Sequence, residues 1–225
     1  MIPDKNLFLV TSALRPLSGV WTPEQRFSQT VETIKTIKKM VPDSMILFTD
    51  VSVHPVPQME KDIISNSCDF YYDLSQEPTT KQLSENRMQS AAETALLFNT
   101  LAHFKNEPRL KQVKRIFKVS GRSILEDGFN VDDHDHFGKF VFKTRIPTWM
   151  NPVQPEADHL LITRMYSFCP SLIDTYLTVL QQNMSLYNRI DFEHAHYANI
   201  PKKYLVELDR IYCWGWLSGG KIEHY

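Results

Sequence analysis

Residues 115–125 read Arg115-Ile116-Phe117-Lys118-Val119-Ser120-Gly121-Arg122-Ser123-Ile124-Leu125, and this stretch decides the interpretation of the chain. A short apolar run, typical of a buried strand, leads directly into a small cationic turn. Two basic side chains, a hydroxyl group and a glycine therefore gather at the end of a predicted strand. Ligands of open α/β sheets bind at strand ends of this kind, and these groups suit a phosphorylated ligand. A β-hairpin turn with solvated basic side chains is the alternative.

Two other apolar runs flank a predicted helix in the first fifty residues. Leu7–Val10 and Met45–Phe48 each have the length of a buried strand. Between them, Thr22-Pro23-Glu24-Gln25 is a capping-box pattern with proline at the first helical position. Apolar residues then recur at helical spacing up to Val41, which predicts an amphipathic helix packed on a sheet. The order strand, helix, strand predicts a right-handed βαβ unit with a parallel pair.

The remainder of the chain continues this alternation. We expect a flexible loop from Ser75 to Gln82, an amphipathic helix from Ser84 to about Phe104, and a short helix near Pro201–Leu208. The predicted fold class is α/β, with one domain over residues 1–225 and a mostly parallel central sheet that carries helices on both faces. Residues 1 to about 125 are expected to form a Rossmann-like, nucleotide-binding half. Residues from about 126 to 225 are expected to supply the other wall of a cleft.

Composition excludes several classes of protein. Of the 225 residues, 42% are hydrophobic and 23% are charged, which is ordinary for a globular protein and argues against disorder. The formal net charge of −1 provides no general basic field, so we expect no nucleic-acid partner and only a local anion site. Three cysteines without a CxxC pattern are expected to be reduced thiols. We expect neither a signal peptide nor a membrane span, and therefore a soluble, cytoplasmic protein.

Four residues near the predicted strand ends are candidates for ligand contacts. Thr11 and Ser12 end the first strand and Asp50 ends the second, so all three should lie at one edge of the sheet. Asp50 can accept hydrogen bonds from a ribose or a base, although a turn or a helix cap is an equal alternative. Arg26 lies in the first turn of the first helix, beside the positive end of the helix dipole, which favours an anionic ligand or an acidic partner there.

The cationic turn supplies four more candidates. Lys118, Ser120 and Arg122 can hold a diphosphate, and Gly121 allows the backbone to approach closely. The chain has seven glycines in all and lacks the glycine-rich phosphate-binding motifs, as well as G-x-S-x-G and H-E-x-x-H. Any phosphate must therefore be bound by side chains and metal.

Two acidic clusters provide candidates for metal binding and catalysis. Asp133 and Asp135 form a D-x-D that can hold a divalent cation between carboxylate and phosphate oxygens, unless the run is a solvated loop. Farther along, Asp191 and Glu193 precede a predicted helix, and a carboxylate next to a cleft can act as a general base. The alternative is that these acids complement the helix dipole, which fits Asp191 better than Glu193.

The order of these motifs resembles a family of small glycosyltransferase-like proteins with a GT-A-type fold, found among large DNA viruses, phages and some bacteria. The Lys-x-Ser-Gly-Arg segment is the most specific part of the resemblance. The matching segments run through most of the chain and are Thr11-Ser12, Pro23-Glu24-Gln25-Arg26-Phe27-x-Gln29-Thr30, Ile46-Leu47-Phe48-x-Asp50-x-Ser52, Ala92-Glu93, Phe117-Lys118-Val119-Ser120-Gly121-Arg122 and Phe192-Glu193-His194.

The resemblance implies transfer of a sugar from a nucleoside-diphosphate sugar donor to a glycan, a glycoprotein or another hydroxyl acceptor. In GT-A enzymes, a D-x-D at the end of a central strand normally holds Mn²⁺ or Mg²⁺ on the diphosphate. Here that strand ends at Lys118–Arg122, so either the Asp133/Asp135 pair holds the metal or the cationic side chains replace it. By analogy, Glu193, or else Asp191, deprotonates the acceptor in an inverting displacement; a retaining mechanism stays open. The alternatives are a metal-dependent phosphoester hydrolase and a non-catalytic nucleotide-sugar-binding protein.

Overall fold

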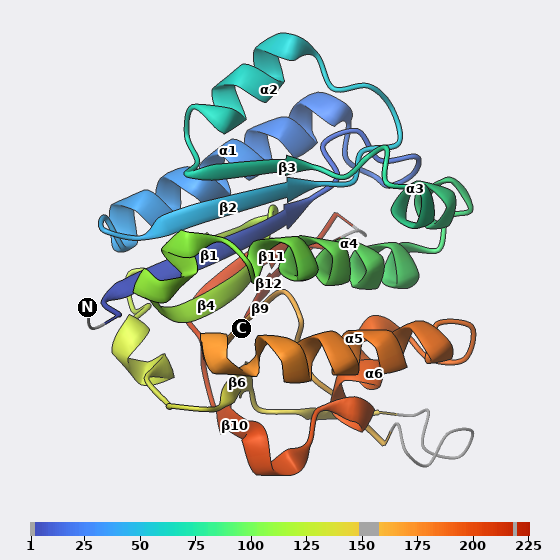
Figure 1. The fold of residues 1–225 in the computed structure, drawn as a ribbon. Helices are drawn as coiled ribbons and strands as arrows, with labels where there is room; N and C mark the ends of the chain where they lie inside the picture. The colour runs from blue at the N-terminus through green and yellow to red at the C-terminus, as the bar shows by residue number, and fades with distance from the viewer. Residues whose placement is uncertain (1–2, 149–157, 218–219) are drawn as a thin grey trace.

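A computed structural model describes residues 3–148, 158–217 and 220–225, and a seven-stranded sheet lies at its centre (Figure 1). The strand order is β10-β6-β9-β4-β1-β2-β3. Strand β9 runs antiparallel to both of its neighbours, β4 and β6, and the other pairs in this sheet are parallel. The strands are β1 (Lys5–Ser12), β2 (Met45–Asp50), β3 (Phe70–Asp73), β4 (Val113–Ser120), β6 (Phe140–Lys143), β9 (Met165–Phe168) and β10 (Leu205–Leu208). The predicted α/β class with a mostly parallel sheet is confirmed.

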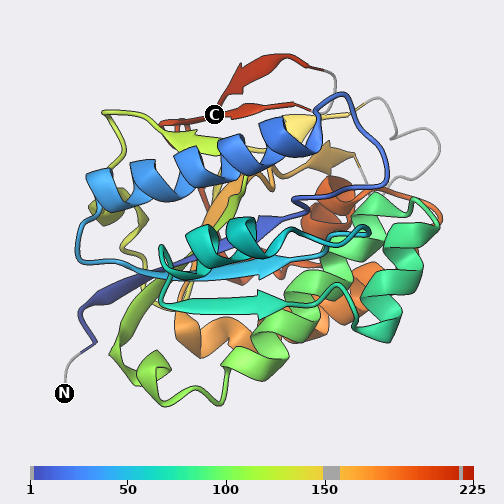
Figure 2. The ribbon, with the colours of Figure 1, turned by 90° about the horizontal axis from the view of Figure 1, so that it is seen from above.

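Helices cover both faces of this sheet, as Figures 1 and 2 show. The side chains of β1 alternate between the two faces. Leu9 is buried in one apolar cluster with Leu97 of α4, and Phe8 is buried in another with Ile34 of α1. Burial on both faces explains why the strand reads as a continuous apolar run. The helices are α1 (Pro23–Met40), α2 (Gln58–Ser65), α3 (Pro78–Glu85), α4 (Gln89–Phe104), α5 (Ile173–Leu186) and α6 (Phe192–Asn199).

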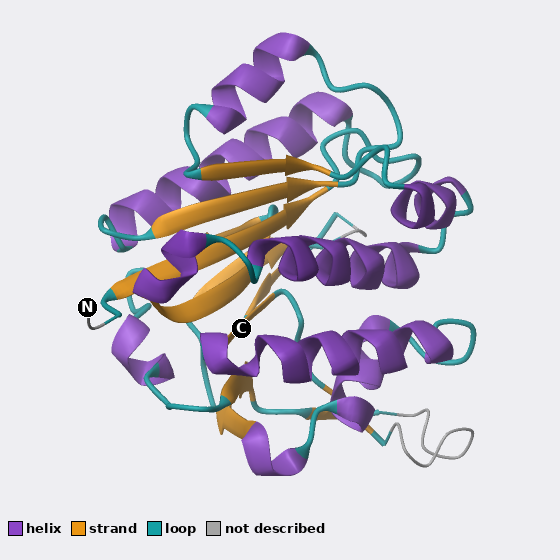
Figure 3. Ribbon diagram, in the orientation of Figure 1, coloured by secondary structure: helices purple, strands orange, loops and turns teal. Residues whose placement is uncertain are grey.

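Smaller elements surround the main sheet, coloured by type in Figure 3. A three-stranded sheet has the order β12-β11-β5, and its strand β5 follows directly after the turn that ends β4. The remaining elements are the strands β5 (Ser123–Leu125), β7 (Ile146–Pro147), β8 (His159–Leu160), β11 (Cys213–Trp216) and β12 (Ile222–His224), and the short 3₁₀ helices η1 (Pro108–Gln112), η2 (Val131–His134), η4 (Pro170–Leu172) and η5 (Lys202–Tyr204). Within the described ranges, no helix is long and apolar enough to cross a membrane.

Helix α1 begins where the capping box predicts. The Thr22 side chain accepts a hydrogen bond from the Gln25 backbone N–H at 3.3 Å, and the Gln25 side chain accepts one from the Thr22 N–H at 2.8 Å. These two bonds satisfy N–H groups that the first turn of a helix leaves unpaired. They also fix the point at which the helix starts, and with it the position of Arg26 one turn later.

Two expectations about local structure are wrong. Much of the stretch predicted as a flexible loop, Ser75–Gln82, belongs to helix α3, because Pro78 starts the helix and the Glu77 side chain caps it with a 2.6 Å bond from the Thr80 N–H. Of the short helix predicted near Pro201–Leu208, Lys202–Tyr204 forms the 3₁₀ helix η5, but the prediction is wrong for residues 205–208, which form strand β10 because they pair in parallel with β6. Pairing with a distant strand outweighs local helical preference there.

The order of the strands around β1 creates a crevice beyond the carboxyl ends of the strands. From β1 the chain moves to β2 and β3 on one side, and it then returns to β4 on the other side. In register, Thr11 pairs with Ser120, and Ser12 pairs with Asp50. The predicted meeting of these strand ends at one edge is confirmed. Strands that diverge in this way leave a crevice beyond their carboxyl ends, where ligands of α/β sheets bind.

Candidate functional site

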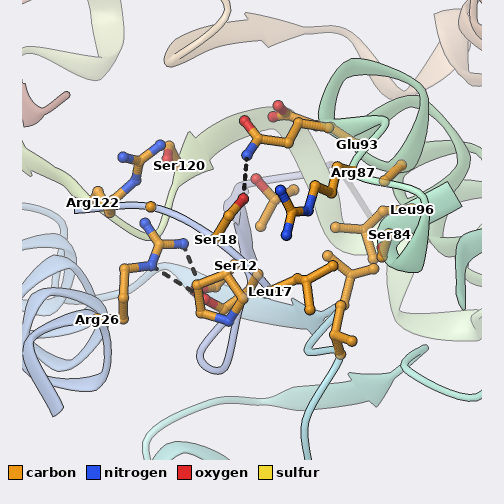
Figure 4. A pocket seen from close by; sticks show the side chains of 18 of the residues that line it. Ser12, Leu17, Ser18, Arg26, Ser84, Arg87, Glu93, Leu96, Ser120 and Arg122 are labelled. Atoms are coloured by element: carbon orange, nitrogen blue, oxygen red, sulfur yellow. Dashed lines mark hydrogen bonds between the residues drawn. The ribbon is translucent and has the colours of Figure 1, made fainter. Parts of the chain in front are cut away.

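A pocket of about 190 Å³ opens at the carboxyl ends of β1 and β4 (Figure 4). The loop between β1 and α1, the start of α4 and the turn after β4 form its walls. The lining residues are Thr11, Ser12, Ala13, Pro16, Leu17, Ser18, Gly19, Trp21, Arg26, Val51, Val53, Ser84, Arg87, Gln89, Ala92, Glu93, Leu96, Ser120 and Arg122. The pocket therefore occupies the crevice that the strand order creates.

The turn after β4 is held by its backbone on several sides. The Ser120 N–H donates to the Arg164 carbonyl at 2.8 Å, and the Gly121 N–H donates to the Thr11 carbonyl at 2.8 Å. The Gly121 carbonyl accepts a 3.0 Å bond from the Thr30 hydroxyl, and the Arg122 carbonyl accepts one from the Trp216 N–H at 3.0 Å. Because these backbone groups are hydrogen-bonded, the turn holds the backbone of Arg122 in place, and with it the point from which the Arg122 side chain extends.

Gly121 is required by space. A Cβ atom at this position would lie 2.9 Å from the Cβ of Ser12 and 3.0 Å from the Thr30 hydroxyl oxygen. Such contacts are closer than packed side chains allow. The glycine therefore lets β4, β1 and α1 meet beneath the pocket, whereas the sequence predicted a close approach of its backbone to a diphosphate.

Three arginines line the pocket and a fourth lies near it. Arg26 and Arg122 lie next to each other on one wall, and Arg87 lies across from them (Figure 4). The Arg26 guanidinium donates to the Ala13 carbonyl from Nε at 3.2 Å and from Nη2 at 3.1 Å. Arg122 and Arg164 are close enough to Arg26 to repel it electrostatically. The pocket therefore concentrates positive charge in a chain whose net charge is −1.

Burial and repulsion between the arginines both shift the pKa values of Arg26 and Arg122. Burial, followed by repulsion from Arg122, lowers the pKa of Arg26 to about 9. Burial and repulsion from Arg164 likewise lower the pKa of Arg122 to about 10. Both groups remain cationic at neutral pH, but their charge is incompletely compensated by the protein. An anion placed between them relieves the repulsion.

Beside the arginines lies an ion pair that joins β4 to α4, in which the lysine is buried and the glutamate is partly exposed. The Lys118 side chain is 1% exposed, and its Nζ donates to Glu93 Oε1 at 2.5 Å and to the Thr163 carbonyl at 2.8 Å. Glu93 lines the pocket. Burial opposes its ionisation, but Lys118, Arg164 and Arg122 hold the pKa of Glu93 below its usual value. Glu93 is therefore a carboxylate at neutral pH.

A second carboxyl group is connected to this pair through Thr163. The Thr163 hydroxyl donates to Glu193 Oε1 at 3.0 Å, and the carbonyl of the same residue accepts from Lys118. Burial, and then the negative charges of Glu93 and Asp191, raise the pKa of Glu193 above its usual value. The two glutamates thus have pKa values pushed in opposite directions, an arrangement that is common among acid–base pairs in active sites.

The predicted ligand residues fall into two groups. Thr11, Ser12, Arg26, Ser120 and Arg122 all line the pocket, as the sequence predicts for residues at these strand and helix ends. The other predicted ligand residues, Lys118, Gly121 and Asp50, lie beneath the pocket and are not among the residues that line it.

The residues beneath the pocket are Lys118, Gly121 and Asp50. Lys118 forms an ion pair with Glu93, and Gly121 packs closely against Ser12 and Thr30, as described above. Asp50 is fully buried, and its carboxylate accepts hydrogen bonds from the Leu14 N–H at 3.0 Å and the Ser52 N–H at 3.2 Å. The prediction that Asp50 contacts a ribose or base is therefore corrected: its side chain braces the two loops that carry the pocket.

Neither predicted catalytic carboxylate is among the residues that line the pocket, but hydrogen bonds through Thr163 and Lys118 link Glu193 to Glu93, which does line it. Asp191 caps helix α6 by accepting from the His194 N–H at 3.0 Å, and it also contacts the His194 ring at 2.6 Å. It acts on the site through its charge, because that charge helps to raise the pKa of Glu193. The alternative that the sequence offered for Asp191 was to complement the helix dipole, and its position as the N-cap of α6 agrees with that alternative.

Asp133 and Asp135, the predicted metal ligands, are not at the pocket. They lie in and just after η2, and Asp135 forms an ion pair with Lys114 Nζ at 2.8 Å. Lys114 is near the start of β4, six residues before Ser120, and a strand of that length spans roughly 20 Å. Among the described residues, no cluster of three or more His, Cys, Asp or Glu side chains can hold a metal ion. The structure therefore does not join the two acidic clusters that a metal-dependent hydrolase requires.

Most of the lining residues were not predicted as ligand contacts, and three of these, Arg87, Glu93 and Trp21, bear on the chemistry of the pocket. Arg87 lies in the turn between α3 and α4, where the sequence predicted one continuous helix, and its φ of 59° is a left-handed conformation that costs a residue with a Cβ about 1–2 kcal/mol. Glu93 was noted only as part of a helix. Trp21, in the first loop, donates from Nε1 to the Leu217 carbonyl at 2.9 Å. In the sequence, only a turn signal at Asn86–Arg87 could have indicated the position of Arg87. The positions of Glu93 and Trp21 at the pocket depend on tertiary contacts.

Solved structures with the same fold are glycosyltransferases. Core-mannan synthase A of Aspergillus fumigatus, in a Mn/GDP form, superposes over 92% of this chain and 73% of its own, with a TM-score of 0.51 and 9% identity. The mannosyltransferase Ktr4p of S. cerevisiae gives 0.52 and 9% identity over 91% and 69%. Mouse xyloside xylosyltransferase 1 gives 0.50 and 11% identity over 91% and 84%. The chain has the fold of these glycosyltransferases. No family model and no curated protein matches its sequence.

The fold raises the question of whether this pocket fits a divalent cation, since one of these structures contains manganese. Mn²⁺ and Mg²⁺ prefer several oxygen ligands, with carboxylates foremost. The end of β4 instead presents Ser120, Gly121 and Arg122. Among the described lining residues, Glu93 is the only carboxylate, and Lys118 already occupies one of its oxygens. The side chains of the pocket therefore do not fit a divalent cation.

Proposed function

We propose that the protein is a glycosyltransferase that moves a sugar from a nucleoside-diphosphate sugar to a hydroxyl group of a glycan or glycoprotein acceptor. The observation that carries the proposal is the group of arginines at the carboxyl ends of β1 and β4, in a fold that glycosyltransferases share. The fold alone does not assign an activity. The chemistry of the pocket supports the proposal, because it suits a diphosphate.

The donor's diphosphate is placed at Arg26 and Arg122, beside the Ser120 hydroxyl. Guanidinium groups bind phosphate oxygens through short, charge-assisted hydrogen bonds, and Arg122 Nε is buried without a partner among the described residues. The nucleoside is placed against the apolar part of the pocket, where Trp21, Val51 and Val53 offer flat and aliphatic surface. The N-terminal half, to about residue 125, would then bind the donor, and residues from about 126 onward would face the acceptor.

The proposed reaction is a displacement at the anomeric carbon of the donor sugar. The acceptor oxygen forms a bond to that carbon, the bond to the diphosphate oxygen breaks, and the acceptor proton passes to a carboxylate. Glu193 is the proposed base, because its raised pKa makes it a stronger proton acceptor than an ordinary glutamate. Arg122 and Arg26 stabilise the negative charge that develops on the leaving diphosphate. Asp191 remains the second candidate from the sequence, but its carboxylate is engaged as a helix cap.

The test is a panel of UDP-, GDP- and dTDP-sugars, with thermal stabilisation and donor hydrolysis as readouts. One donor class is expected to stabilise the protein and to be hydrolysed slowly without an acceptor. Arg122→Ala should abolish the stabilisation, whereas Arg109→Ala should not, since Arg109 is an exposed arginine before the start of β4. A protein that responds to none of these donors, or whose response survives Arg122→Ala, would contradict the proposal. Transfer that persists at wild-type rate in Glu193→Ala would remove the assigned base.

A further inference from the structure

The pocket of the proposed glycosyltransferase contains the charges needed to bind a diphosphate without help from a metal ion. We infer that Arg122 and Arg26 take the place of a divalent cation, so that donor binding and transfer need neither Mn²⁺ nor Mg²⁺. The inference rests on the proposed function and specifies how that same site compensates the charge of its donor.

The first observation is the chemistry at the end of β4. This position faces the pocket through Ser120 and Arg122, and their backbone is pinned by bonds to Arg164, Thr11 and Trp216. A hydroxyl group is a weak ligand for a hard cation, and a guanidinium repels one. Because the turn is fixed, Arg122 cannot move its backbone away to make room for a metal. The end of β4 therefore favours the binding of an anion without a metal ion between the anion and the protein.

The second observation concerns Glu93, the single carboxylate among the described lining residues. Its Oε1 accepts a hydrogen bond from Lys118 Nζ at 2.5 Å. The Lys118 side chain is 1% exposed, and its Nζ also donates to the Thr163 carbonyl. A cation on Glu93 would lie within a few ångströms of this buried ammonium group. Separating the pair would also leave the buried Lys118 ammonium group without a counter-charge, with only the Thr163 carbonyl among the described residues to accept its hydrogen bonds, which is strongly unfavourable. Glu93 is thus committed to Lys118.

The third observation is the state of the arginines. Arg122 Nε is buried and has no hydrogen-bond partner among the described residues, although buried donors are nearly always paired. Arg122 also interacts with two other cations, Arg26 and Arg164, and its carboxylate neighbour, Glu93, is shared with Lys118. A diphosphate supplies both the missing acceptor and the missing negative charge. A metal ion supplies neither.

The fourth observation removes the other source of ligands. Asp133 and Asp135 lie beside the start of β4, where Asp135 pairs with Lys114. They cannot reach a phosphate held at the opposite end of the strand.

The experiment is calorimetric titration of the full chain with UDP, GDP and dTDP, each in EDTA and in Mn²⁺ or Mg²⁺. The nucleotide that binds should do so with affinities that agree within about threefold across these conditions. In EDTA, Arg122→Ala and the polar but uncharged Arg122→Gln should each weaken binding at least tenfold, corresponding to about 1.4 kcal/mol. Arg109→Ala should leave affinity unchanged. Thermal unfolding of each variant confirms that it folds. The corresponding nucleoside, which has no phosphate, should bind the wild-type protein and the Arg122 variants with the same affinity.

The outcomes separate this inference from the proposed function. Binding that disappears in EDTA and returns with Mn²⁺ would overturn the inference while leaving a nucleotide-sugar enzyme intact. Binding of no nucleotide under any condition would overturn both. Metal-free binding that is indifferent to Arg122→Ala and Arg122→Gln would also contradict the inference, because the charge would then be compensated elsewhere.

Discussion

Gly121 is the residue at which the pocket tolerates the least change. Gly121→Ala places a Cβ 2.9 Å from the Cβ of Ser12, and we expect it to lower the free energy of unfolding by about 1–3 kcal/mol. It should also weaken donor binding, because Arg122 follows directly in the chain. Urea unfolding and nucleotide titration measure the two effects.

The control for Gly121→Ala is the same substitution in a Ser12→Gly background. Removing the Ser12 side chain takes away the closest atoms, so the added methyl group should cost less there. Equal costs in the two backgrounds would show that the contact with Ser12 does not constrain Gly121.

Glu193 should control the pH dependence of transfer. A base must be deprotonated to act, so the rate is expected to rise with pH through the pKa of Glu193, which burial, Glu93 and Asp191 hold above the ordinary value. Glu93→Gln removes a nearby negative charge, so it should lower that pKa and move the rising limb of the profile to lower pH. Glu193→Gln should reduce kcat by roughly 10²–10⁴-fold with donor affinity unchanged.

Exposed Glu32 on α1 provides the matched control for these glutamate variants. Glu32→Gln should change neither the position of the profile nor kcat. A profile that stays in place in Glu93→Gln would mean that a group other than Glu193 sets it.

Asp50 should make stability depend on pH. Burial, partly opposed by hydrogen bonds from Leu14 and Ser52, raises its pKa from 3.8 to about 6 in the folded protein. Well below pH 3.8 the carboxyl is protonated in both the folded and the unfolded state and has no effect on stability. As the pH rises toward 6, ionisation favours the unfolded chain, so the free energy of unfolding should fall by roughly 3 kcal/mol relative to Asp50→Asn. Urea unfolding from pH 4 to pH 7 tests this; parallel curves for the two proteins would refute it.

Helix α1 depends on its N-cap for its starting point. Thr22→Ala removes the acceptor for the Gln25 N–H, which should cost about 1 kcal/mol of stability. Because Arg26 lies in the turn that follows, its hold on the Ala13 carbonyl should loosen, and nucleotide affinity should fall with stability. Lys35→Ala, an exposed change in the same helix, serves as the control in thermal unfolding and titration. Equal behaviour of the two variants would contradict a role for the cap.

Elements with strong local signals were predicted from the sequence. Strands β1, β2 and β4 have apolar runs buried on both faces, and α1 has a capping box and a regular apolar stripe. Strand β10 was not predicted, because its formation depends on pairing with β6 more than sixty residues away along the chain. Helix α3 was missed because a polar sequence hides a start that Pro78 and Glu77 define.

The pocket as a whole combines predictable and unpredictable parts. The strand order brings together Thr11, Ser12, Ser120 and Arg122, which their positions after apolar runs already indicated. The partnership of Lys118 with Glu93 was beyond reach, since it joins a strand to a helix that lies on the face of the sheet. The same limit applies to the metal assignment: a D-x-D in the sequence cannot reveal at which end of β4 it lies.

The central claim is that a nucleoside diphosphate binds at the carboxyl ends of β1 and β4 between Arg26 and Arg122. A crystal structure of the protein with the nucleotide selected by titration, grown in EDTA, tests it most directly. The account predicts phosphate oxygens within hydrogen-bonding distance of the Arg122 guanidinium, including its buried Nε, and the base against Trp21 or Val53. A nucleotide bound elsewhere, or one whose phosphates point away from both arginines, would contradict it.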